Sequence, residues 1–253
     1  MLNYVEYGKE NKYDDDIFFQ KYSQMSRSQQ GLAGAGEWET LRKLLPDFKD
    51  KRVLDLGCGY GWHCIYAMEH GASSVVGVDI SHKMLEVAKE KTHFPQVEYK
   101  CCAIEDVEFP EESFDVILSS LAFHYVADYE ILVKKIYRIL KSGGKLVFTV
   151  EHPVFIAYGT QDWYYNEKGE ILHFPVDNYY YEGKRTAVFL GEKVTKFHRT
   201  LTTYLNTLLS NGFIINHIVE PQPPEYMMDI PGMQDEMRRP MMLIVSANKK
   251  VDR

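Results

Sequence analysis

The sequence contains 253 residues, of which 45% are hydrophobic, and it has a net charge of −7. This length supports one large α/β domain, or a core domain with an elaboration. The acidic charge disfavours binding to nucleic acid, since the densest basic runs, Lys134–Lys135 and Arg238–Arg239, are short. No apolar run approaches the roughly 18 residues of a membrane span, and the polar N-terminal sequence is unlike a signal or transit peptide. We therefore expect a cytoplasmic protein that binds neither membranes nor nucleic acid.

The cysteine pattern predicts reduced thiols and no metal site. All four cysteines lie in the first 102 residues, and none forms a Cys-x-x-Cys pair: Cys58, Cys64, Cys101 and Cys102. Such an arrangement is typical of free thiols in a reducing compartment. It agrees with the cytoplasmic location expected from the N-terminal sequence.

The first 50 residues are predicted to contribute two helices before the sheet begins. Three aspartates at 14–16 precede apolar residues spaced by three and four positions, which indicates a helix near 14–25. A second helix is expected at 38–45, before Pro46, and the glycine-rich segment 30–36 connects the two. These helices would either pack against the sheet or form a lid over a ligand.

The stretch VLDLGCGYGWH at 53–63 is the strongest pattern in the chain. Residues 52–56 are predicted to form a strand, and residues 62–70 a helix that ends at Gly71. Gly57, Gly59 and Gly61 would then lie in the turn between them, where glycine lets a ligand approach the backbone. The free N–H groups at the start of the helix favour the negative or polar part of that ligand.

A second acidic residue supports a ligand that contains a nucleoside. Residues 74–79 read as another strand, which ends at Asp79 about twenty residues after the first glycine. An acid at this distance is typical of one that accepts hydrogen bonds from ribose hydroxyls. We therefore favour a nucleoside-type ligand over a purely structural turn.

The chain continues to alternate strands and helices up to residue 150. Further strands are predicted at 96–101, 114–119 and 145–150. One helix would begin after Ser81, and another would cover 128–141 and end at Gly143–Gly144. This alternation predicts an α/β fold with a parallel sheet and helices on both of its faces.

Residues 153–198 interrupt the alternation with an aromatic-rich insert. Turn sequences at 166–169, 182–183 and 190–191 favour short antiparallel strands. After the insert we expect a helix at 199–210 and strands at 213–219 and 241–247, with a long loop at 221–240. Because parallel sheets bind ligands at the carboxyl ends of their strands, the insert is expected on the substrate side.

Four segments resemble the motifs of class I S-adenosylmethionine (SAM)-dependent methyltransferases. They are VLDLGCGYG at 53–61, VVGVDIS at 75–81, AIEDVEFPEESFDVILSSLAFHYV at 103–126 and LKSGGKLVFTVEHP at 140–153. The closing MMLIVSANK at 241–249 is similar to the last, antiparallel strand of the family. The resemblance is to the branch that contains ubiquinone-biosynthesis-type and other small-molecule enzymes.

This resemblance implies a single methyltransferase domain over residues 1–253. Its core would be a Rossmann-like, mostly parallel sheet of seven strands with helices on both faces. The cofactor would be S-adenosyl-L-methionine, and the partner a small-molecule methyl acceptor. The protein would be a monomer or a homodimer.

The resemblance also assigns residues to parts of the cofactor. The backbone of the glycine loop would face the methionine part, and Asp55 would hold the loop and reach the amino group through water. Asp79 would accept hydrogen bonds from the two ribose hydroxyls. Because many relatives have an acid where this chain has Ala103, Glu105 or a backbone carbonyl would bind the adenine amino group. The full cofactor set is Asp55, Gly57, Cys58, Gly59, Gly61, Asp79, Ile80, Met84, Ile104, Glu105, Ser119 and Leu121.

Candidate acceptor residues follow the fourth and fifth predicted strands. His124 would face the transferred methyl group and is the one candidate for a catalytic acid or base; its alternative role is structural. We expect the remaining residues to enclose an apolar or aromatic acceptor, together with the loop around Met227–Met228: Tyr125, His152, Trp163, Tyr179 and Tyr180. In the alternative interpretation, the insert aromatics form a small core or a dimer contact.

Two other functions remain open from the residues alone. A nicotinamide-dependent oxidoreductase would share the fold class and the ribose acid. However, the turn lacks Gly-x-Gly-x-x-Gly, because Trp62 follows Gly61 where the pattern needs the last glycine. A protein that binds SAM without catalysis has the same sequence features as an enzyme.

Overall fold

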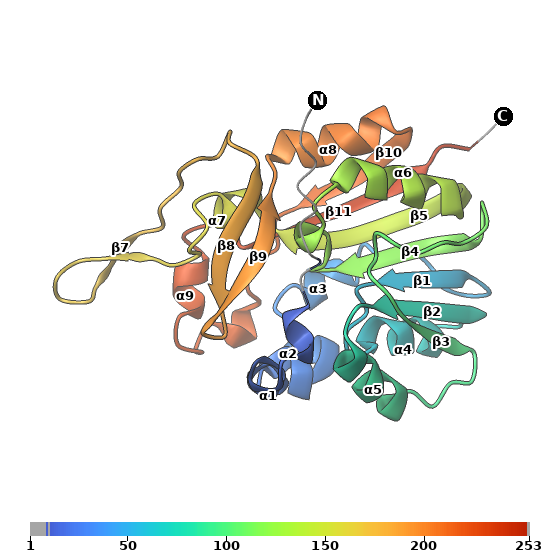
Figure 1. Ribbon diagram of the computed structural model, residues 1–253, viewed down its shortest axis with the longest axis horizontal. Helices are drawn as coiled ribbons and strands as arrows, with labels where there is room; N and C mark the ends of the chain where they lie inside the picture. Colours follow the sequence, from blue (N-terminus) through green and yellow to red (C-terminus); the bar gives the residue numbers. More distant parts are fainter. Residues whose placement is uncertain (1–8, 10, 252–253) are drawn as a thin grey trace.

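The computed structural model describes residue 9 and residues 11–251, and its centre is a seven-stranded sheet (Figure 1). The strand order is β10-β11-β5-β4-β1-β2-β3. Strand β11 runs antiparallel to both of its neighbours, whereas the pairs from β5 to β3 are parallel. The strand bounds are β1 Arg52–Leu56, β2 Ser74–Asp79, β3 Val97–Cys101, β4 Phe114–Ser120, β5 Leu140–Glu151, β10 Phe213–Val219 and β11 Met242–Lys249. The predicted Rossmann-like, mostly parallel sheet is confirmed.

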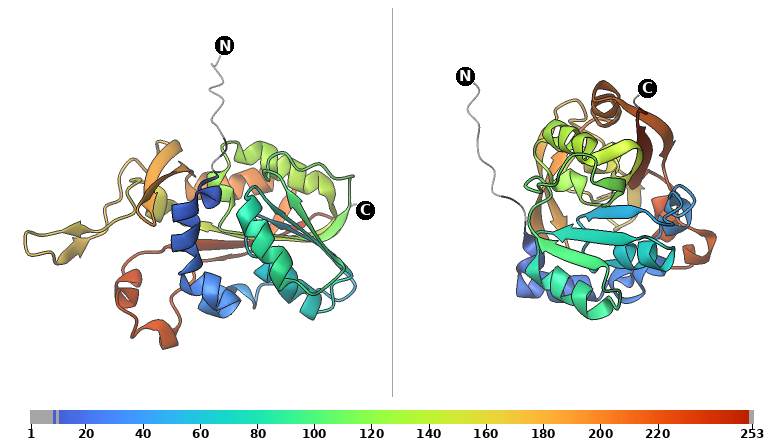
Figure 2. Two further views of the ribbon diagram at one scale, coloured as in Figure 1. Left: turned by 60° about the horizontal axis from the view of Figure 1, so that its bottom comes forward. Right: turned by 90° about the vertical axis from the view of Figure 1, so that its right-hand side faces the viewer.

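Helices cover both faces of the sheet, as the alternation predicted (Figure 2). Neighbouring residues of one strand, Val53 and Leu54, are both fully buried, but in two different cores. This follows from the alternation of side chains along a strand. The core around Leu54 includes apolar residues of α6 Tyr129–Ile139 and α8 Leu201–Ser210. The core around Val53 includes residues of α3 Trp38–Leu41, α4 Trp62–Glu69 and α5 His82–Lys91.

Some predicted boundaries need correction. Helix α6 ends at Ile139, and Gly143–Gly144 lie inside β5 and do not cap the helix. The register explains this, because Phe114 of β4 pairs with Leu140, whereas Val116 pairs with Lys145. The extra residues of β5 form a bulge, and Gly143 at φ +72° permits it. The second N-terminal helix is a single turn, α3, and a short 3-10 helix, η2 Gly31–Gly34, occupies the predicted connector.

The insert consists of a short helix and two hairpins. Helix α7 Pro153–Ile156 comes first, and β6 Tyr164–Tyr165 pairs with β7 Ile171–His173 on an arm that extends from the body (Figure 1). Strand β8 Gly183–Phe189 then pairs with β9 Glu192–His198. Leu190 and Gly191 connect these strands with φ angles of 55° and 79°. Two successive positive φ angles are typical of a tight hairpin turn, as predicted at this position.

The N-terminal segment packs against the second hairpin of the insert. This segment contains η1 Lys12–Asp14, α1 Asp16–Ser23 and α2 Ser26–Gln29. Phe18 is fully buried against Ala187 and Val194, and the Lys21 ammonium donates to the carbonyl oxygen of Leu190 at 2.9 Å. We call residues 12–29 together with the β8–β9 hairpin the roof, because both border the cavity described below. Two short helices, η4 Glu225–Met227 and α9 Met233–Glu236, lie in the loop before β11.

Among the described residues, no helix combines the length and the apolar character that crossing a membrane would require.

We predict that Phe18→Ala loosens the roof while the central sheet stays folded. Removing a buried phenylalanine side chain costs about 3–5 kcal/mol, and this side chain belongs to a small cluster separate from both sheet cores. Hydrogen exchange should become faster in α1, β8 and β9 and stay slow in β1, β4 and β5. The matched control is Ile17→Ala on the same helix, where the side chain is 59% exposed. Unchanged exchange in β8 and β9 would show that the segments are not coupled.

Candidate active site

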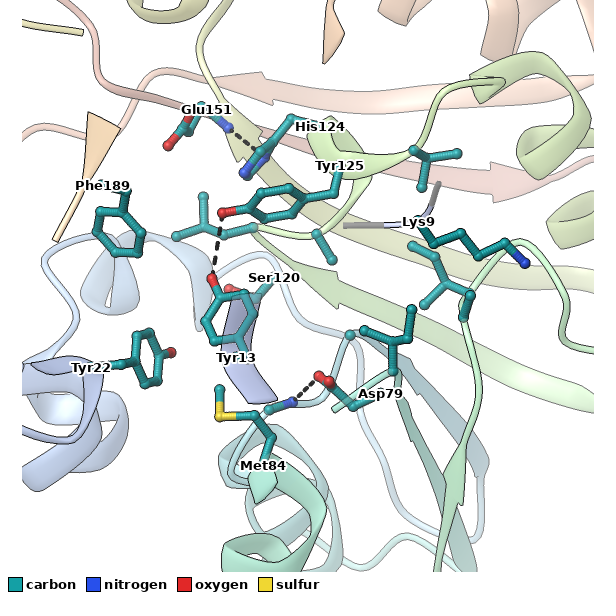
Figure 3. Close-up of a pocket in the computed structure, with 18 of the residues that line it drawn as sticks. Lys9, Tyr13, Tyr22, Asp79, Met84, Ser120, His124, Tyr125, Glu151 and Phe189 are labelled. Carbon is teal, nitrogen blue, oxygen red and sulfur yellow. Dashed lines mark hydrogen bonds between the residues drawn. The ribbon is translucent and has the colours of Figure 1, made fainter. Parts of the chain in front are cut away.

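A cavity of about 250 Å³ lies at the carboxyl ends of β1, β2, β4 and β5 (Figure 3). Asp79 lies at one end and Glu151 at the other, with Tyr13 and Ser120 between them. Besides Lys9, its lining comes from three regions. They are the glycine loop with the ends of β2 and β3 and the start of α5, the ends of β4 and β5 with the start of β11, and the roof. The roof contributes Tyr13, Tyr22, Met25, Arg27 and Phe189.

The glycine loop has a geometry that other residues would disturb. Gly57, Gly59 and Gly61 have φ angles of 77°, 52° and 74°, which side chains disfavour. A Cβ atom on Gly57 would also lie 2.4 Å from the Cβ atom of Ala122. The loop is attached to β2, because the N–H groups of Gly57 and Cys58 donate to the Val78 carbonyl oxygen at 2.8 and 2.9 Å.

Asp79 is oriented by backbone donors and still faces the cavity. Its Oδ2 accepts from the Gly59 N–H and its Oδ1 from the Ser81 N–H, each at 2.9 Å. A carboxylate has about four acceptor positions, so each oxygen retains capacity for another donor. Burial raises the pKa of Asp79 above its usual value, although these hydrogen bonds oppose the shift. Such a carboxylate fits a pair of ribose hydroxyls.

Asp55 lies behind the loop and is not among the cavity-lining residues. It is 1% exposed, and its Oδ2 accepts from the Cys64 thiol at 3.4 Å. Its Oδ1 has no hydrogen-bond partner among the described residues. Burial raises the pKa of Asp55 to about 7. The loop is thus attached through Val78 and Asp79, while Asp55 contacts helix α4.

Several of the other predicted cofactor residues meet in this cavity. Those that line it are Ile80, Met84, Ile104, Glu105 and Leu121, next to Gly57, Gly59 and Asp79. Gly61 caps α4, and Cys58 borders a second cavity of about 80 Å³ that shares lining residues with the first. Ser119 points elsewhere, because its hydroxyl donates to the Leu56 carbonyl oxygen at 2.7 Å. Its neighbour Ser120 faces the cavity in its place.

His124 lies on the short 3-10 helix η3 Phe123–Tyr125 and lines the cavity near Glu151, at the end opposite Asp79 (Figure 3). The Glu151 backbone N–H donates to His124 Nδ1 at 3.3 Å. Burial lowers the pKa of His124 to about 4, so the ring is neutral at neutral pH. Since Nδ1 accepts, the ring hydrogen is on Nε2. His124 can therefore donate a hydrogen bond through Nε2, and its role as a catalytic acid or base stays a prediction.

Most of the predicted insert residues are not in the cavity lining. Trp163 packs its ring against Phe174 at a centroid distance of 5.3 Å, and Tyr180 is 88% exposed. The Tyr179 hydroxyl accepts from the Leu201 backbone N–H at 3.0 Å. His152 caps α7 by accepting from the Val154 N–H, and Met227–Met228 belong to the loop around η4. Of the predicted acceptor residues, only His124 and Tyr125 line the cavity.

The structure adds functional candidates that the sequence did not single out. Tyr13 and Tyr125 meet above the cavity with their hydroxyls 3.4 Å apart, and Phe189 lies beside them. Arg27 borders both cavities and forms an ion pair with Glu37 at 2.8 Å. Glu151 follows the predicted strand 145–150 directly, and this position at the carboxyl end of a parallel strand was a usable signal. The roof residues gave no such signal, because their contacts are distant in sequence.

A turn of glycines beside a buried carboxylate, at the carboxyl edge of a mostly parallel sheet whose last strand is reversed, is typical of a protein that binds a nucleoside-type cofactor. Residues 54–148 match the family model described as a methyltransferase domain. A solved structure from Listeria monocytogenes, assigned to the SAM-dependent methyltransferases, is 57% identical. It superimposes with a TM-score of 0.83 and covers 87% of this chain and 99% of its own. The chain therefore belongs to the SAM-dependent methyltransferases, and its cofactor is SAM.

Two relatives show how far this similarity extends. An uncharacterized protein from Haemophilus influenzae is 34% identical over 94% of this chain and 96% of its own length. A ubiquinone biosynthesis O-methyltransferase from Coxiella burnetii is 36% identical, but over only 44% of this chain and 47% of its own length. The family assignment therefore applies to the chain as a whole, whereas the similarity to a ubiquinone-type enzyme covers less than half of the chain.

We predict that Asp79→Ala weakens binding of S-adenosylhomocysteine (SAH) more than Glu105→Ala does. Removing the Asp79 carboxylate leaves the ribose hydroxyls and two backbone N–H groups without their acceptor, at roughly 1–3 kcal/mol for each buried donor. Glu105 is only partly buried, and its carbonyl, not its side chain, binds Lys135. Calorimetry should show a loss of at least about tenfold for Asp79→Ala. Equal or reversed losses would show that the ribose and adenine positions are misassigned.

We also predict that Asp55 makes the unliganded protein less stable as the pH rises from 4 to 7. The unfolded chain ionises this carboxyl near pH 4, whereas the folded protein holds the proton up to about pH 7. A folded-state pKa above the unfolded one gives stability that is lost as the pH rises, here roughly 4 kcal/mol. Asp55→Asn should remove this decline, as measured by urea unfolding at several pH values. An unchanged decline in the variant would assign it to other groups.

Proposed function

We propose that this methyltransferase acts on a small-molecule acceptor of apolar or aromatic character. The observation that carries the proposal is the roof, which borders the cavity from the side away from the sheet. Tyr13, Tyr22 and Phe189 face the cavity from two segments far apart in sequence, and these segments pack on each other through Phe18. A cavity covered in this way suits a molecule that can be enclosed.

Within this proposal the cofactor lies between Asp79 and Ser120. Bound SAM supplies an electrophilic methyl group on a positively charged sulfur. Asp79 would bind the ribose, and Met84 and Ile104 would contact the adenine, as the lining of this end of the cavity supports. The methyl group would then point from Ser120 toward His124, Tyr125 and Glu151. Placing the acceptor in line behind the methyl group is chiefly a task of proximity and orientation.

Arg27 is our candidate for the carboxylate of the methionine part. It borders the cavity beside Gly57 and Gly59, and its guanidinium donates to both carboxylate oxygens of Glu37, at 2.8 and 2.9 Å. A guanidinium fixed in this way presents its remaining N–H groups in a defined direction. The roof would thereby contact the cofactor as well as the acceptor.

The similarity to a ubiquinone biosynthesis O-methyltransferase supports an acceptor of this kind only in part, because it covers less than half of either chain.

We further propose a cytoplasmic enzyme that is a monomer or a homodimer and does not act on nucleic acid. The four free cysteines support the cytoplasmic location, and the acidic net charge of −7 disfavours a nucleic-acid substrate.

We predict that SAH raises the melting temperature of the protein and that NADH does not. A ligand that binds only the folded state stabilises it by about 2.7 kcal/mol at one hundred times its dissociation constant. Differential scanning fluorimetry measures both ligands under identical conditions. Methyl transfer from radiolabelled SAM should then appear in a small-molecule fraction of a cell extract. Label found only in the protein or RNA fraction would contradict the proposed acceptor class.

A further inference from the structure

Glu151 lies where the acceptor is expected to meet the methyl group. It is the last residue of β5, and its side chain lines the cavity at the end opposite Asp79 (Figure 3). Thr149, two residues earlier on the same face of the strand, contacts the end of β4. Its hydroxyl lies 3.3 Å from the Ser120 hydroxyl and accepts from the Leu121 N–H at 3.0 Å. Glu151 is therefore the next residue on this face of β5 after Thr149, which lies beside the expected position of the transferred methyl group.

A closed set of hydrogen bonds fixes the Glu151 carboxylate. The Lys196 ammonium donates to Glu151 Oε1 at 2.5 Å, and the Gln161 amide donates to Oε2 at 2.6 Å. Lys196 also donates to Gln161 Oε1 at 2.8 Å. Lys196 is 1% exposed, and its ammonium lies 5.5 Å from the Phe189 ring centroid. A buried lysine tied to one carboxylate keeps that carboxylate ionised and oriented.

Among the described residues, the titratable groups that interact with Glu151 include side chains of three elements. Lys196 belongs to β9, His124 to η3 and Tyr204 to α8, whereas β11 contributes Met242, which pairs with Glu151. Burial alone would raise the pKa of Glu151, but the Lys196 ammonium and the two side-chain hydrogen bonds lower it. Glu151 is therefore an anion at neutral pH.

Glu151 and His124 offer complementary hydrogen-bonding partners to one acceptor group. His124 Nδ1 is occupied by the Glu151 N–H, so the ring can present only its Nε2–H, a donor. The Glu151 carboxylate can only accept. A hydroxyl oxygen both accepts and donates, and it satisfies the two groups together, whereas a protonated amine offers no acceptor for His124.

The buried charges at this end also disfavour a cationic acceptor. Lys196 and Arg199 are both buried cations, and Glu151 is the carboxylate that pairs with Lys196. Arg199 is bound by main-chain carbonyl oxygens, among them that of Ala127 at 2.9 Å. The sulfonium of the cofactor adds a further positive charge, so an incoming ammonium would meet repulsion in a region shielded from water. A neutral hydroxyl compound avoids this cost.

We propose that Glu151 is the catalytic proton acceptor and that the methyl acceptor carries a weakly acidic hydroxyl, as in a phenol or an enol. This inference rests on the proposed function and names the acceptor group for the same cavity. The hydroxyl oxygen forms a bond to the methyl carbon, and the carbon–sulfur bond breaks with its electron pair passing to sulfur. The hydroxyl proton passes to Glu151 and then to solvent. His124 donates a hydrogen bond to the same oxygen, and Lys196 and Gln161 are positioning residues.

The ionised state of Glu151 indicates how acidic the hydroxyl of the methyl acceptor must be. A carboxylate held by a lysine is a weak base, and it removes a proton efficiently only from a group whose own acidity is enhanced. A phenol or an enol meets this condition better than a simple alcohol. Their planar, apolar parts also match the aromatic wall formed by Tyr13, Tyr125 and Phe189.

The first test identifies the methylated atom. Wild-type enzyme is incubated with labelled SAM and a panel of catechol, 4-nitrophenol, acetylacetone, phenethylamine, ethanolamine and 2-mercaptoethanol. We expect O-methylated products from a phenol or from the enol of acetylacetone, and no N-methylation. Methyl transfer only to an amine or a thiol would overturn the hydroxyl assignment and leave the proposed function intact. No transfer to any small molecule, together with labelling of macromolecules in an extract, would overturn both.

The second test removes the proton acceptor. With the best hydroxyl substrate, Glu151→Gln should lower kcat by at least about one hundredfold, because general base catalysis contributes roughly 10²–10⁴-fold. Its affinity for SAH in calorimetry should stay within about twofold of wild type. Glu151→Asp keeps the charge and should retain part of the activity. This variant provides the test if Glu151→Gln folds poorly. The matched control is Glu98→Gln on β3, which is exposed and forms a surface ion pair with Lys100. A kcat of Glu151→Gln close to that of the control would overturn the assignment.

The third test separates positioning from simple structural support. Lys196→Met should move the rising limb of the kcat–pH profile to higher pH, because Glu151 loses the cation that favours its ionised form. Lys196→Arg should restore the limb toward its wild-type position. Infrared difference spectra of the carboxyl band, with Glu151→Gln as the reference, follow the same ionisation without any turnover. A loss of activity in Lys196→Met at every pH, with an unchanged carboxyl titration, would contradict the pairing.

Discussion

The whole site depends on how the glycine loop is held against the end of β2. The Val78 carbonyl oxygen accepts from two loop N–H groups, and the Asp79 carboxylate accepts from a third, that of Gly59. The same carboxylate therefore shapes the loop and faces the cavity. A ligand that binds Asp79 meets a backbone already in place, and little ordering entropy remains to be lost on binding. The left-handed glycines are the local cost of this arrangement, and a Cβ atom would lie 2.4 Å from Ala122 Cβ at Gly57 and 2.2 Å from the Tyr99 hydroxyl at Gly61.

A second constraint joins segments that are distant in the sequence. Asp14 accepts from the Lys83 N–H at 3.1 Å and from the Ser81 hydroxyl at 2.6 Å, so the N-terminal segment is attached to the start of α5. Phe18 and Lys21 attach the same segment to the β8–β9 hairpin. The roof thus spans from the cofactor end of the cavity to the acceptor end. Its small apolar cluster is separate from both sheet cores, which makes it the part best suited to open for ligand entry without unfolding the sheet.

The fold and the cofactor half of the site could be predicted because their signals are local. Alternating strands and helices, the glycine turn and Asp79 each depend on residues close together in sequence. Errors arose where a position had to be exact to one residue. The expected position of Ser119 is off by one residue: its hydroxyl binds the Leu56 carbonyl oxygen, and Ser120 faces the cavity because side chains alternate along a strand. The glycines at 143–144 lie in a bulge and not at the end of a helix, and this bulge depends on pairing with β4.

The acceptor half could not be predicted in the same way, and the reason is physical. Lys196 is one lysine in a strand of mixed polar and apolar residues, and only the packed hairpin shows that it is buried against Glu151. The conspicuous aromatic residues of the insert, such as Trp163 and Tyr180, pack locally or face solvent. The chemistry at this end therefore comes from a carboxylate on the common sheet and a cation supplied by the insert. Because the two lie on different elements, the acceptor group can be set by the insert while the glycine loop and Asp79 keep the same cofactor.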